Sequence, residues 1–256
     1  MRENRPSVLV TGGAKRLGAA IARGFSEAGW HVVIHYRSSA EAAARLAASL
    51  ESAETVCCDL ADGAAAVDMV KGLARRLPEW RALVNNASIF VPDDVTCLDP
   101  ETNRKVMQVN ARTPALMAQA FLAGPQTSAG RTVIQVTDQK LANPNPDFFS
   151  YTMSKHALDA TIAMLAMGAA RDGDRVYGLA PGAILPSHDQ NEEEAEISHR
   201  MNLLGRRTGA DEIARAAVFL ASGRLASGQT LYCDSGQHLL SQPRDVIYLA
   251  REAASA

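Results

Sequence analysis

The chain has 256 residues and a formal net charge of −2, and this length is sufficient for one large α/β domain over residues 1–256. It contains no block of basic residues, which argues against nucleic acid or an anionic membrane as its partner. The four cysteines form no C-x-x-C pair, so we expect reduced thiols in a cytoplasmic protein. We expect neither a signal peptide nor a membrane-spanning segment.

Short runs of β-branched residues alternate with alanine-rich stretches along the chain. Strands are expected at 8–10, 32–34, 55–57, 82–84, 132–134, 175–177 and 229–233. Helices are expected near 16–28, 40–50, 64–76, 101–122 and 211–221, with another that carries Tyr151 and Lys155 to about residue 170. Strands that recur with helices between them are typical of a parallel sheet covered on both faces. The sequence therefore predicts a single α/β domain built on a Rossmann-type, doubly wound parallel sheet.

Residues 186–207 interrupt this alternation. They are polar, they include three consecutive glutamates from Glu192, and they contain no predicted strand. We expect an insertion over the open end of the sheet that acts as a substrate lid. His188, His199 and the glutamates lack the spacing of metal ligands, so they are interpreted as a solvated face or mobile lid, and no metal site is expected.

A glycine-rich turn follows the first predicted strand and opens the first helix, with the sequence T-G-G-A-K-R-L-G over residues 11–18. Glycines allow a tight turn and close approach of the backbone to a pyrophosphate, and the helix N-terminus adds N–H groups and a positive dipole. An ordinary strand–helix turn is the alternative, but the position near the N-terminus favours a dinucleotide site. The residues expected to contact the cofactor are Thr11, Gly12, Arg16, Leu17 and Gly18.

The second predicted strand ends in Tyr36, Arg37 and Ser38. NAD-binding units usually place an acidic residue near this point to hold the ribose 2′-hydroxyl, and none is present. Arg37 and Ser38 instead offer charge and hydrogen bonds to a 2′-phosphate, and Arg16 could join them. The sequence thus favours NADPH over NADH, with a solvated loop as the alternative role for Arg37.

Asp59 and Leu60 follow the third predicted strand. At this position an acidic side chain could accept a hydrogen bond from an adenine amine. A helix N-cap is an equally good interpretation of Asp59.

Tyr151 and Lys155 form a Tyr-x-x-x-Lys pair, which shares one face of a helix. A nearby ammonium stabilises a phenolate, so we expect Lys155 to lower the pKa of Tyr151 and make it a proton donor near neutral pH. Asp138 ends the apolar run 132–137 and would lie beside this pair. A carboxylate there suits a substrate with N–H donors better than a ketone, whose oxygen becomes negative during reduction. Capping the following turn is the alternative role for Asp138.

Together these residues resemble the short-chain dehydrogenase/reductase family over nearly the whole chain. The shared motifs, in family order, are the glycine turn, Asn85-Asn86-Ala87, Asn110, Tyr151 with Lys155, and Pro181-Gly182. Within the family, the chain is most similar to the pteridine reductases and the related bacterial dihydromonapterin and dihydrofolate reductases. That narrower likeness is carried by Arg16 in the pattern T-G-x-x-x-R-x-G, the segment His35-Tyr36-Arg37-Ser38, Ser88 with Phe90, and Asp138 where the family usually has serine.

The resemblance implies catalytic roles for four residues. Tyr151 would donate a proton, and Lys155 would hold the nicotinamide ribose. Asp138 would orient Tyr151 and, directly or through water, help to protonate a ring nitrogen. Asn110 would support a water molecule near Lys155.

The resemblance also implies binding roles. Asn86, Ala87 and Ser88 would contact the cofactor, and Pro181-Gly182 would shape the nicotinamide pocket. Ser88 would touch substrate or a cofactor phosphate, and Phe90 would stack on a pterin ring, which suits a flat aromatic ligand.

The expected function is therefore NADPH-dependent reduction of a small molecule, a dihydropterin or dihydrofolate, to its tetrahydro form. A carbonyl reductase acting on a 3-oxoacyl thioester, sugar or steroid is one alternative, and a non-catalytic NADP(H)-binding sensor is another. Because the relatives are often tetramers, a homotetramer is expected as well.

Overall fold

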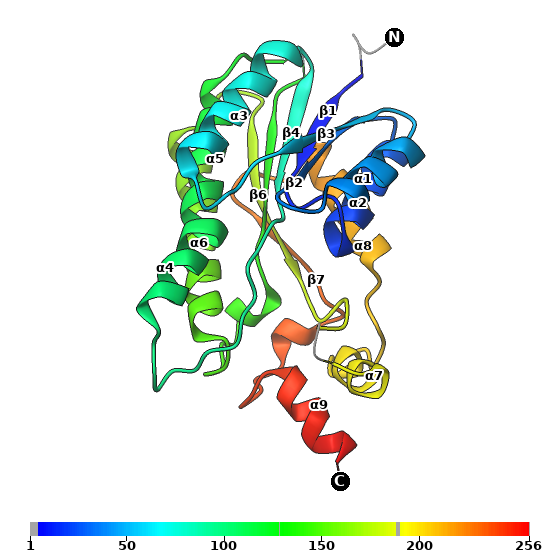
Figure 1. The fold of residues 1–256 in the computed structure, drawn as a ribbon, viewed down its shortest axis with the longest axis vertical. Helices are drawn as coiled ribbons and strands as arrows, with labels where there is room; N and C mark the ends of the chain where they lie inside the picture. The colour runs from blue at the N-terminus through cyan, green and yellow to red at the C-terminus, as the bar shows by residue number, and fades with distance from the viewer. Residues whose placement is uncertain (1–4, 128, 188–189, 256) are drawn as a thin grey trace.

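Parallel strands form one continuous sheet at the centre of the molecule. In the computed structural model, which describes residues 5–127, 129–187 and 190–255, this sheet has seven strands in the order β3-β2-β1-β4-β5-β6-β7 (Figure 1). The strands are β1 (Ser7–Val10), β2 (His31–Tyr36), β3 (Ala53–Cys57), β4 (Trp80–Asn85), β5 (Thr132–Val136), β6 (Arg175–Pro181) and β7 (Thr230–Cys233). The strand order reverses between β1 and β4, which confirms the predicted doubly wound sheet.

Helices follow most of the strands. They are α1 (Arg16–Glu27), α2 (Ala40–Ser49), α3 (Gly63–Arg76), α4 (Pro100–Met107), α5 (Thr113–Ala123), α6 (Phe149–Gly168), α7 (Glu192–Arg200), α8 (Ala210–Ala221) and α9 (Val246–Ala254). Among the residues that the structure describes, no helix is both long and apolar enough to cross a bilayer.

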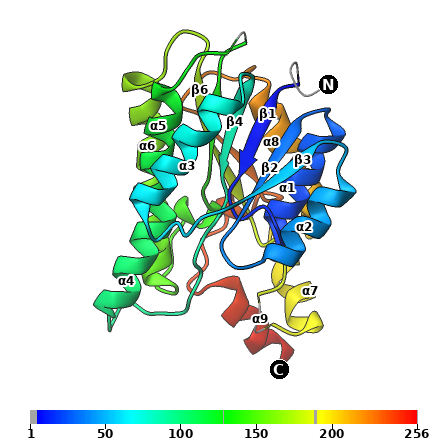
Figure 2. The same ribbon diagram turned by 45° about the horizontal axis from the view of Figure 1, so that its top comes forward.

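Helices cover both faces of the sheet (Figure 2), and a hydrophobic core lies on each face. On one face, α1, α2 and α8 pack against Val8 and Val10. On the other face, α3, α5 and α6 pack against Leu9 and Val133. Because successive side chains of a strand point to opposite faces, the apolar run Val8-Leu9-Val10 contributes to both cores.

The helices differ from the sequence prediction in three places. The single helix expected near 101–122 is divided into α4 and α5 by a π-helical segment at Gln108–Arg112. The segment 186–207 contains α7, which begins with a capping box between Asn191 and Glu194. Residues 188–189, and with them His188, lie outside the described residues. The helix α9 is also absent from the sequence prediction.

The helices α7 and α9 pack together beyond the carboxyl ends of the strands, at the bottom of Figure 1. In open α/β sheets this edge, at the point where the strand order reverses, is where ligands bind. The strand order therefore places the glycine turn after β1 beside the loops that follow β4, β5 and β6.

Candidate active site

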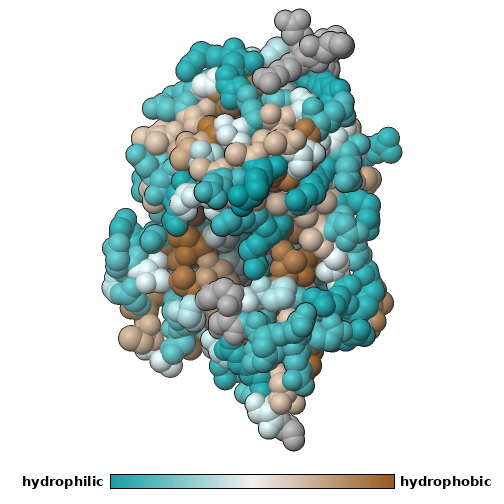
Figure 3. Space-filling view, turned by 45° about the vertical axis from the view of Figure 1, so that its right-hand side comes forward, coloured by the Kyte–Doolittle hydropathy of each residue, from teal (hydrophilic) through white to brown (hydrophobic). Residues whose placement is uncertain are grey.

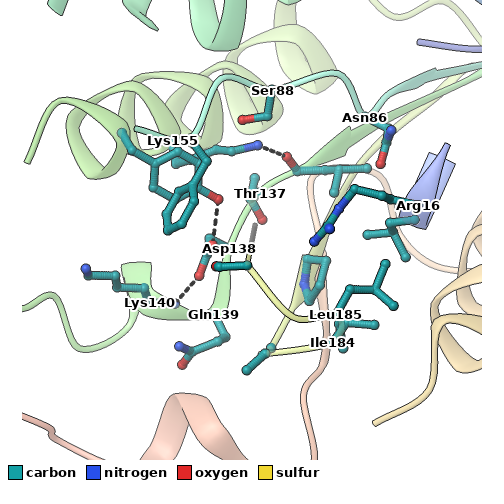
Figure 4. A pocket seen from close by; sticks show the side chains of 18 of the residues that line it. Arg16, Asn86, Ser88, Thr137, Asp138, Gln139, Lys140, Lys155, Ile184 and Leu185 are labelled. Atoms are coloured by element: carbon teal, nitrogen blue, oxygen red, sulfur yellow. Dashed lines mark hydrogen bonds between the residues drawn. The ribbon is translucent and has the colours of Figure 1, made fainter. Parts of the chain in front are cut away.

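A cavity of about 480 Å³ opens at the carboxyl edge of the sheet. Its wall is formed by the glycine turn, the loops after β4, β5 and β6, residues of α7, and the start of α9. Figure 3 shows hydrophobic side chains on both sides of a hollow at the waist of the molecule. In the close view of Figure 4, Asp138 lies on the wall between Lys140 on one side and Arg16 on the other. The size of the cavity is typical of small-molecule sites.

Tyr151 and Asp138 are directly hydrogen-bonded at this wall. The Tyr151 hydroxyl donates to Asp138 Oδ2 over 2.7 Å. The other carboxylate oxygen, Asp138 Oδ1, accepts from the backbone N–H of Lys140 over 2.8 Å. Asp138 therefore caps the following turn, as one interpretation of the sequence proposed, and contacts the tyrosine at the same time.

The expectation that Lys155 lowers the pKa of Tyr151 is wrong in this arrangement. Burial raises the pKa of Tyr151 well above its ordinary value, and the neighbouring Asp138 carboxylate raises it further. Lys155 Nζ instead donates to the carbonyl oxygen of Val136 over 2.7 Å, and it lies 5.6 Å from the centre of the Tyr151 ring. Tyr151 is thus held as a neutral phenol.

Burial also shifts the pKa values of Asp138 and Lys155. It raises the pKa of Asp138, although the hydrogen bond from Tyr151 opposes this effect. Burial lowers the pKa of Lys155 to about 8, with the Asp138 charge opposing. The buried Asp138–Tyr151 pair therefore resists a second negative charge, and such a pair can hold and pass on a proton.

The glycine turn has the shape of a phosphate cradle. Gly12 has a φ of +61°, which favours glycine. A Cβ on Gly18 would lie 2.2 Å from the Gly12 carbonyl oxygen, so a side chain there would displace the turn. The N-cap of α1, Lys15, makes no side-chain capping bond within the described part of the chain. The N–H groups of this helix start can therefore meet an anion, and these residues fit a dinucleotide.

Thr11 and Asn86 join this turn to the loop after β4. Asn86 Nδ2 donates to the Thr11 carbonyl oxygen over 2.9 Å, and the Asn86 N–H donates to Thr11 Oγ1 over 2.9 Å. The N–H of Ala87 reaches the same hydroxyl over 3.0 Å. Asn86, Ala87 and Ser88 line the cavity, whereas Thr11 is buried beneath the turn. Thr11 thus supports the cavity wall through these hydrogen bonds without lining the cavity itself.

His35 supports the glycine turn from β2, with both ring nitrogens engaged. The Gly12 N–H donates to His35 Nδ1 over 3.1 Å, and His35 Nε2 lies 3.0 Å from the Cys58 carbonyl oxygen. Nδ1 must be unprotonated to accept, so the ring is neutral with its hydrogen on Nε2. Burial lowers the pKa of His35, which favours this neutral form.

The residues expected at the adenosine end lie outside the cavity wall, with Arg37 and Ser38 exposed after β2 and Tyr36 partly buried. Arg16 does not join this group, because its guanidinium lines the cavity and donates to the Pro186 carbonyl oxygen over 2.7 Å. This contact ties the start of α1 to the first residue of the expected lid.

Asp59 and Leu60 lie in the turn after β3. Asp59 Oδ1 accepts from the Ala61 N–H over 2.9 Å, but the N-cap of α3 is Asp62, so the N-cap interpretation of Asp59 is wrong. Leu60 is buried, and its carbonyl oxygen accepts from the Thr113 hydroxyl over 2.7 Å.

Asn110 lies in the π-helical segment and not on the cavity wall. Its Oδ1 accepts from the Ile89 N–H over 2.7 Å, and its Nδ2 donates to the Ile89 carbonyl oxygen over 2.9 Å. Nδ2 also donates to Ser154 Oγ over 3.0 Å. Asn110 therefore connects the loop after β4 to α6, and π-helical insertions often occur near functional sites.

Phe90 lines the cavity, but part of its surface is already covered. Its ring stacks on Phe148 at 4.1 Å between centroids and meets Tyr151 edge-on at 4.7 Å. One face of Phe90 is thus taken by Phe148. A substrate ring has access to its other face at most.

Pro181 and Gly182 lie on the wall, as the sequence predicts. Other lining residues are absent from the sequence prediction: Lys15, Thr137, Gln139, Lys140, Gln190, Ser198, His199, Gln237, Asp245, Val246 and Ile247. His199, expected on a solvated face or mobile lid, is 2% exposed and lines the cavity. The packing of α7 and α9 brings Ser198, His199, Asp245, Val246 and Ile247 to the site, so motif spacing gives no signal for them. Lys15 instead lies within the glycine turn, and Thr137, Gln139 and Lys140 flank Asp138. No cluster of three or more potential metal ligands occurs within the described ranges.

We expect His35→Gln to reduce the loss of stability at acid pH. The folded pKa of His35 lies below the unfolded value, so the unfolded chain binds more protons and the wild type loses stability as pH falls below about 6.5. The glutamine variant lacks this contribution. Urea unfolding at pH 7.5 and 5.5 measures it, with His156→Gln on the exposed side of α6 as the control. An equal pH dependence in wild type and His35→Gln would contradict the assignment.

Comparison with known proteins agrees with this geometry. The family model described as Enoyl-(Acyl carrier protein) reductase matches residues 12–238. Pteridine reductase 1 of Leishmania tarentolae is 28% identical over 91% of this chain and 96% of its own length. The structure of FolM alternative dihydrofolate reductase 1 from Brucella suis, in complex with NADP, covers 94% of this chain and 98% of its own, with 34% identity and a TM-score of 0.87.

A ketone-reducing enzyme is also similar. The structure of the angucycline C-6 ketoreductase LanV with bound NADP has a TM-score of 0.83 and 28% identity, and covers 92% of this chain and 96% of its own. A family model spanning most of the sequence and superposition over more than nine-tenths of the chain lead to one assignment. The chain belongs to the short-chain dehydrogenase/reductase family of oxidoreductases.

Proposed function

We propose that this protein reduces a pterin, a dihydropterin or dihydrofolate, to its tetrahydro form with NADPH. The observation that carries the proposal is the hydrogen bond between Tyr151 and Asp138, in a cavity that the glycine turn also lines. The similar proteins named as pteridine reductase and alternative dihydrofolate reductase support the same substrate class.

The cofactor is NADP(H), which the similar structures carry. The pyrophosphate would lie against the glycine turn, and Arg37 and Ser38 would hold the 2′-phosphate. Lys155 would hold the nicotinamide ribose, for which its ammonium would leave the Val136 carbonyl oxygen. NADPH, when bound, supplies a hydride to the substrate carbon. Asn86, Ala87 and Ser88 form the adjoining wall.

Reduction of a C=N bond also requires a proton on nitrogen. If Tyr151 alone gave its proton, a phenolate would face the Asp138 carboxylate across 2.7 Å, and repulsion disfavours this state. Asp138 therefore works in its protonated form, which its raised pKa favours. Asp138 then donates to the Tyr151 oxygen while Tyr151 donates to the substrate nitrogen. One proton leaves the pair, and the final state is a phenol beside one carboxylate.

The cavity wall suits a flat ring with N–H donors. The open face of Phe90 can stack on an aromatic ring, while the hydroxyl of Ser88 offers a hydrogen-bond acceptor. The segment 186–207 would act as a lid, because Arg16 already contacts Pro186 and α7 contributes His199 to the wall. We also propose that the protein forms a homotetramer in the cytoplasm.

Carbonyl reduction is the second candidate. The similarity to an angucycline ketoreductase favours it, and every cofactor residue would serve both reactions. Asp138 does not decide between the two, because its protonated form could pass a proton through Tyr151 to a ketone oxygen as well as to a ring nitrogen. Initial rates with matched panels of dihydropterins and ketones distinguish the two candidates.

Asp138→Asn is expected to lower kcat/KM for a dihydropterin by about 100-fold, because the amide cannot give Tyr151 a proton to replace the one that passes to the substrate. For the wild type, kcat/KM should fall as pH rises through the raised pKa of Asp138, since the working form is protonated. The variant should lack this decline. Steady-state NADPH oxidation from pH 5 to 9 measures both effects.

The control for this prediction is the dissociation constant of NADPH, which Asp138→Asn should leave unchanged. Unchanged turnover in the variant would remove Asp138 from the mechanism. Turnover of ketones but not of pterins by the wild type would favour the second candidate.

Arg37→Leu is expected to weaken NADPH binding by about 10- to 100-fold, because the charged hydrogen bond to the 2′-phosphate is lost. Binding of NADH, which lacks this phosphate, should remain the same. Fluorescence titration of both nucleotides measures the ratio, with Arg23→Leu on the exposed surface of α1 as the control. An equal loss of affinity for both nucleotides would contradict a 2′-phosphate contact.

A further inference from the structure

The C-terminal part of the chain reaches the catalytic wall. Asp245, Val246 and Ile247 line the cavity at the start of α9. Asp245 is the N-cap of this helix, and its Oδ1 accepts from the Ile247 N–H over 3.1 Å. Asp245 also acts electrostatically on both Asp138 and Tyr151. The end of the sequence therefore contributes a second carboxylate near the proton-donating pair.

Lys140 links this carboxylate to Asp138. Its side chain is 5% exposed, and Nζ donates to Asp245 Oδ2 over 3.1 Å and to the Asp147 carbonyl oxygen over 2.6 Å. The backbone N–H of the same residue donates to Asp138 Oδ1 over 2.8 Å. Figure 4 shows the Lys140 side chain leading away from Asp138. The ammonium of Lys140 thus contacts the C-terminal segment, while its backbone N–H contacts Asp138.

Asp147 fixes the same segment from the loop before α6. Its Oδ2 accepts from the Asp245 N–H over 2.7 Å. Arg244 Nε donates to both carboxylate oxygens of Asp147, over 3.0 and 2.9 Å. The ion pair of Lys140 with Asp245 is therefore held at both ends. A buried ammonium that loses its partner is unfavourable, so loss of the Asp245 charge would let the Lys140 turn move.

We propose that Asp245, through its ion pair with Lys140, is a positioning residue that holds the Asp138 carboxylate against Tyr151 and makes the C-terminal segment part of the active site. The inference rests on the proposed role of the Asp138–Tyr151 pair as proton donor. Asp245 and Lys140 support that pair, and neither needs to touch the substrate.

The charges around the pair determine the direction of the effect. Lys155 from α6 and Asp245 act electrostatically on Asp138, Lys140 forms an ion pair with Asp245, and Arg244 forms one with Asp147. The Asp245 charge raises the pKa of both Asp138 and Tyr151. Its removal lowers both pKa values, so the protonated working form is lost at lower pH. The alkaline decline of kcat/KM must then move to lower pH.

The test uses the whole protein with Asp245→Asn, which keeps the size and the capping oxygen of the side chain. We expect kcat for a dihydropterin to fall about tenfold and the alkaline decline to move down by about half a pH unit or more. The dissociation constant of NADPH should not change. Asp245→Glu, which retains the charge, should restore the pH profile of the wild type.

The matched control is Asp211→Asn, which removes an exposed partner of Arg215 in the first turn of α8, away from the cavity. It should leave kcat and the pH profile unchanged. If Asp245→Asn fails to fold, Lys140→Met with Asp245→Asn leaves no unpaired buried charge, and its kcat should fall about tenfold because the Asp138 turn is no longer held. An unshifted pH profile in folded Asp245→Asn, or an unchanged kcat in the double variant, would overturn the proposal.

A second measurement separates this inference from the proposed function. Infrared difference spectra between each protein and its Asp138→Asn form report the pH at which Asp138 titrates, without any substrate. We expect Asp245→Asn to lower this pH, and an unchanged titration would overturn the inference even if pterins are reduced. A lowered titration in a protein that reduces no pterin would support the inference and reject the substrate.

Discussion

The hydrogen bond from Tyr151 to Asp138 is the interaction on which the rest of the site depends. It joins the end of β5 to α6 and keeps the tyrosine a phenol. Because both partners are buried, a second negative charge on the pair is costly, and the pair exchanges protons one at a time. Lys155 contacts the backbone of Val136 instead of the phenol, so its ammonium is available for the cofactor that we propose.

The order of the strands divides the site into two parts. On the β1 side, the glycine turn is held by Thr11 and by the neutral ring of His35, and under the proposed function this part binds the nucleotide. On the β5 and β6 side, the Asp138 turn is held by Lys140 and the start of α9. Arg16 and Pro186 connect the two parts across the cavity. Nucleotide binding and proton donation therefore depend on different supporting residues.

The sequence predicts those features that depend on local patterns. The strand runs, the helical stretches and the glycine turn predict the observed sheet. The Tyr-x-x-x-Lys spacing places Tyr151 and Lys155 on one helix, and the end of a predicted strand places Asp138 beside them. Features that depend on long-range packing are not predicted. The pairing of Lys140 with Asp245 spans 105 positions, and the raised pKa of Tyr151 requires knowledge of which group accepts its hydrogen bond.

A titration of Tyr151 tests the central claim most directly. Tyrosinate has its own ultraviolet absorbance, so the difference between wild type and Tyr151→Phe without nucleotide isolates this residue. We expect no tyrosinate from Tyr151 as the pH passes the ordinary tyrosine value of 10.0, because burial and Asp138 raise the pKa of its hydroxyl. Ionisation of Tyr151 near neutral pH would contradict it and would assign control of the phenol to Lys155.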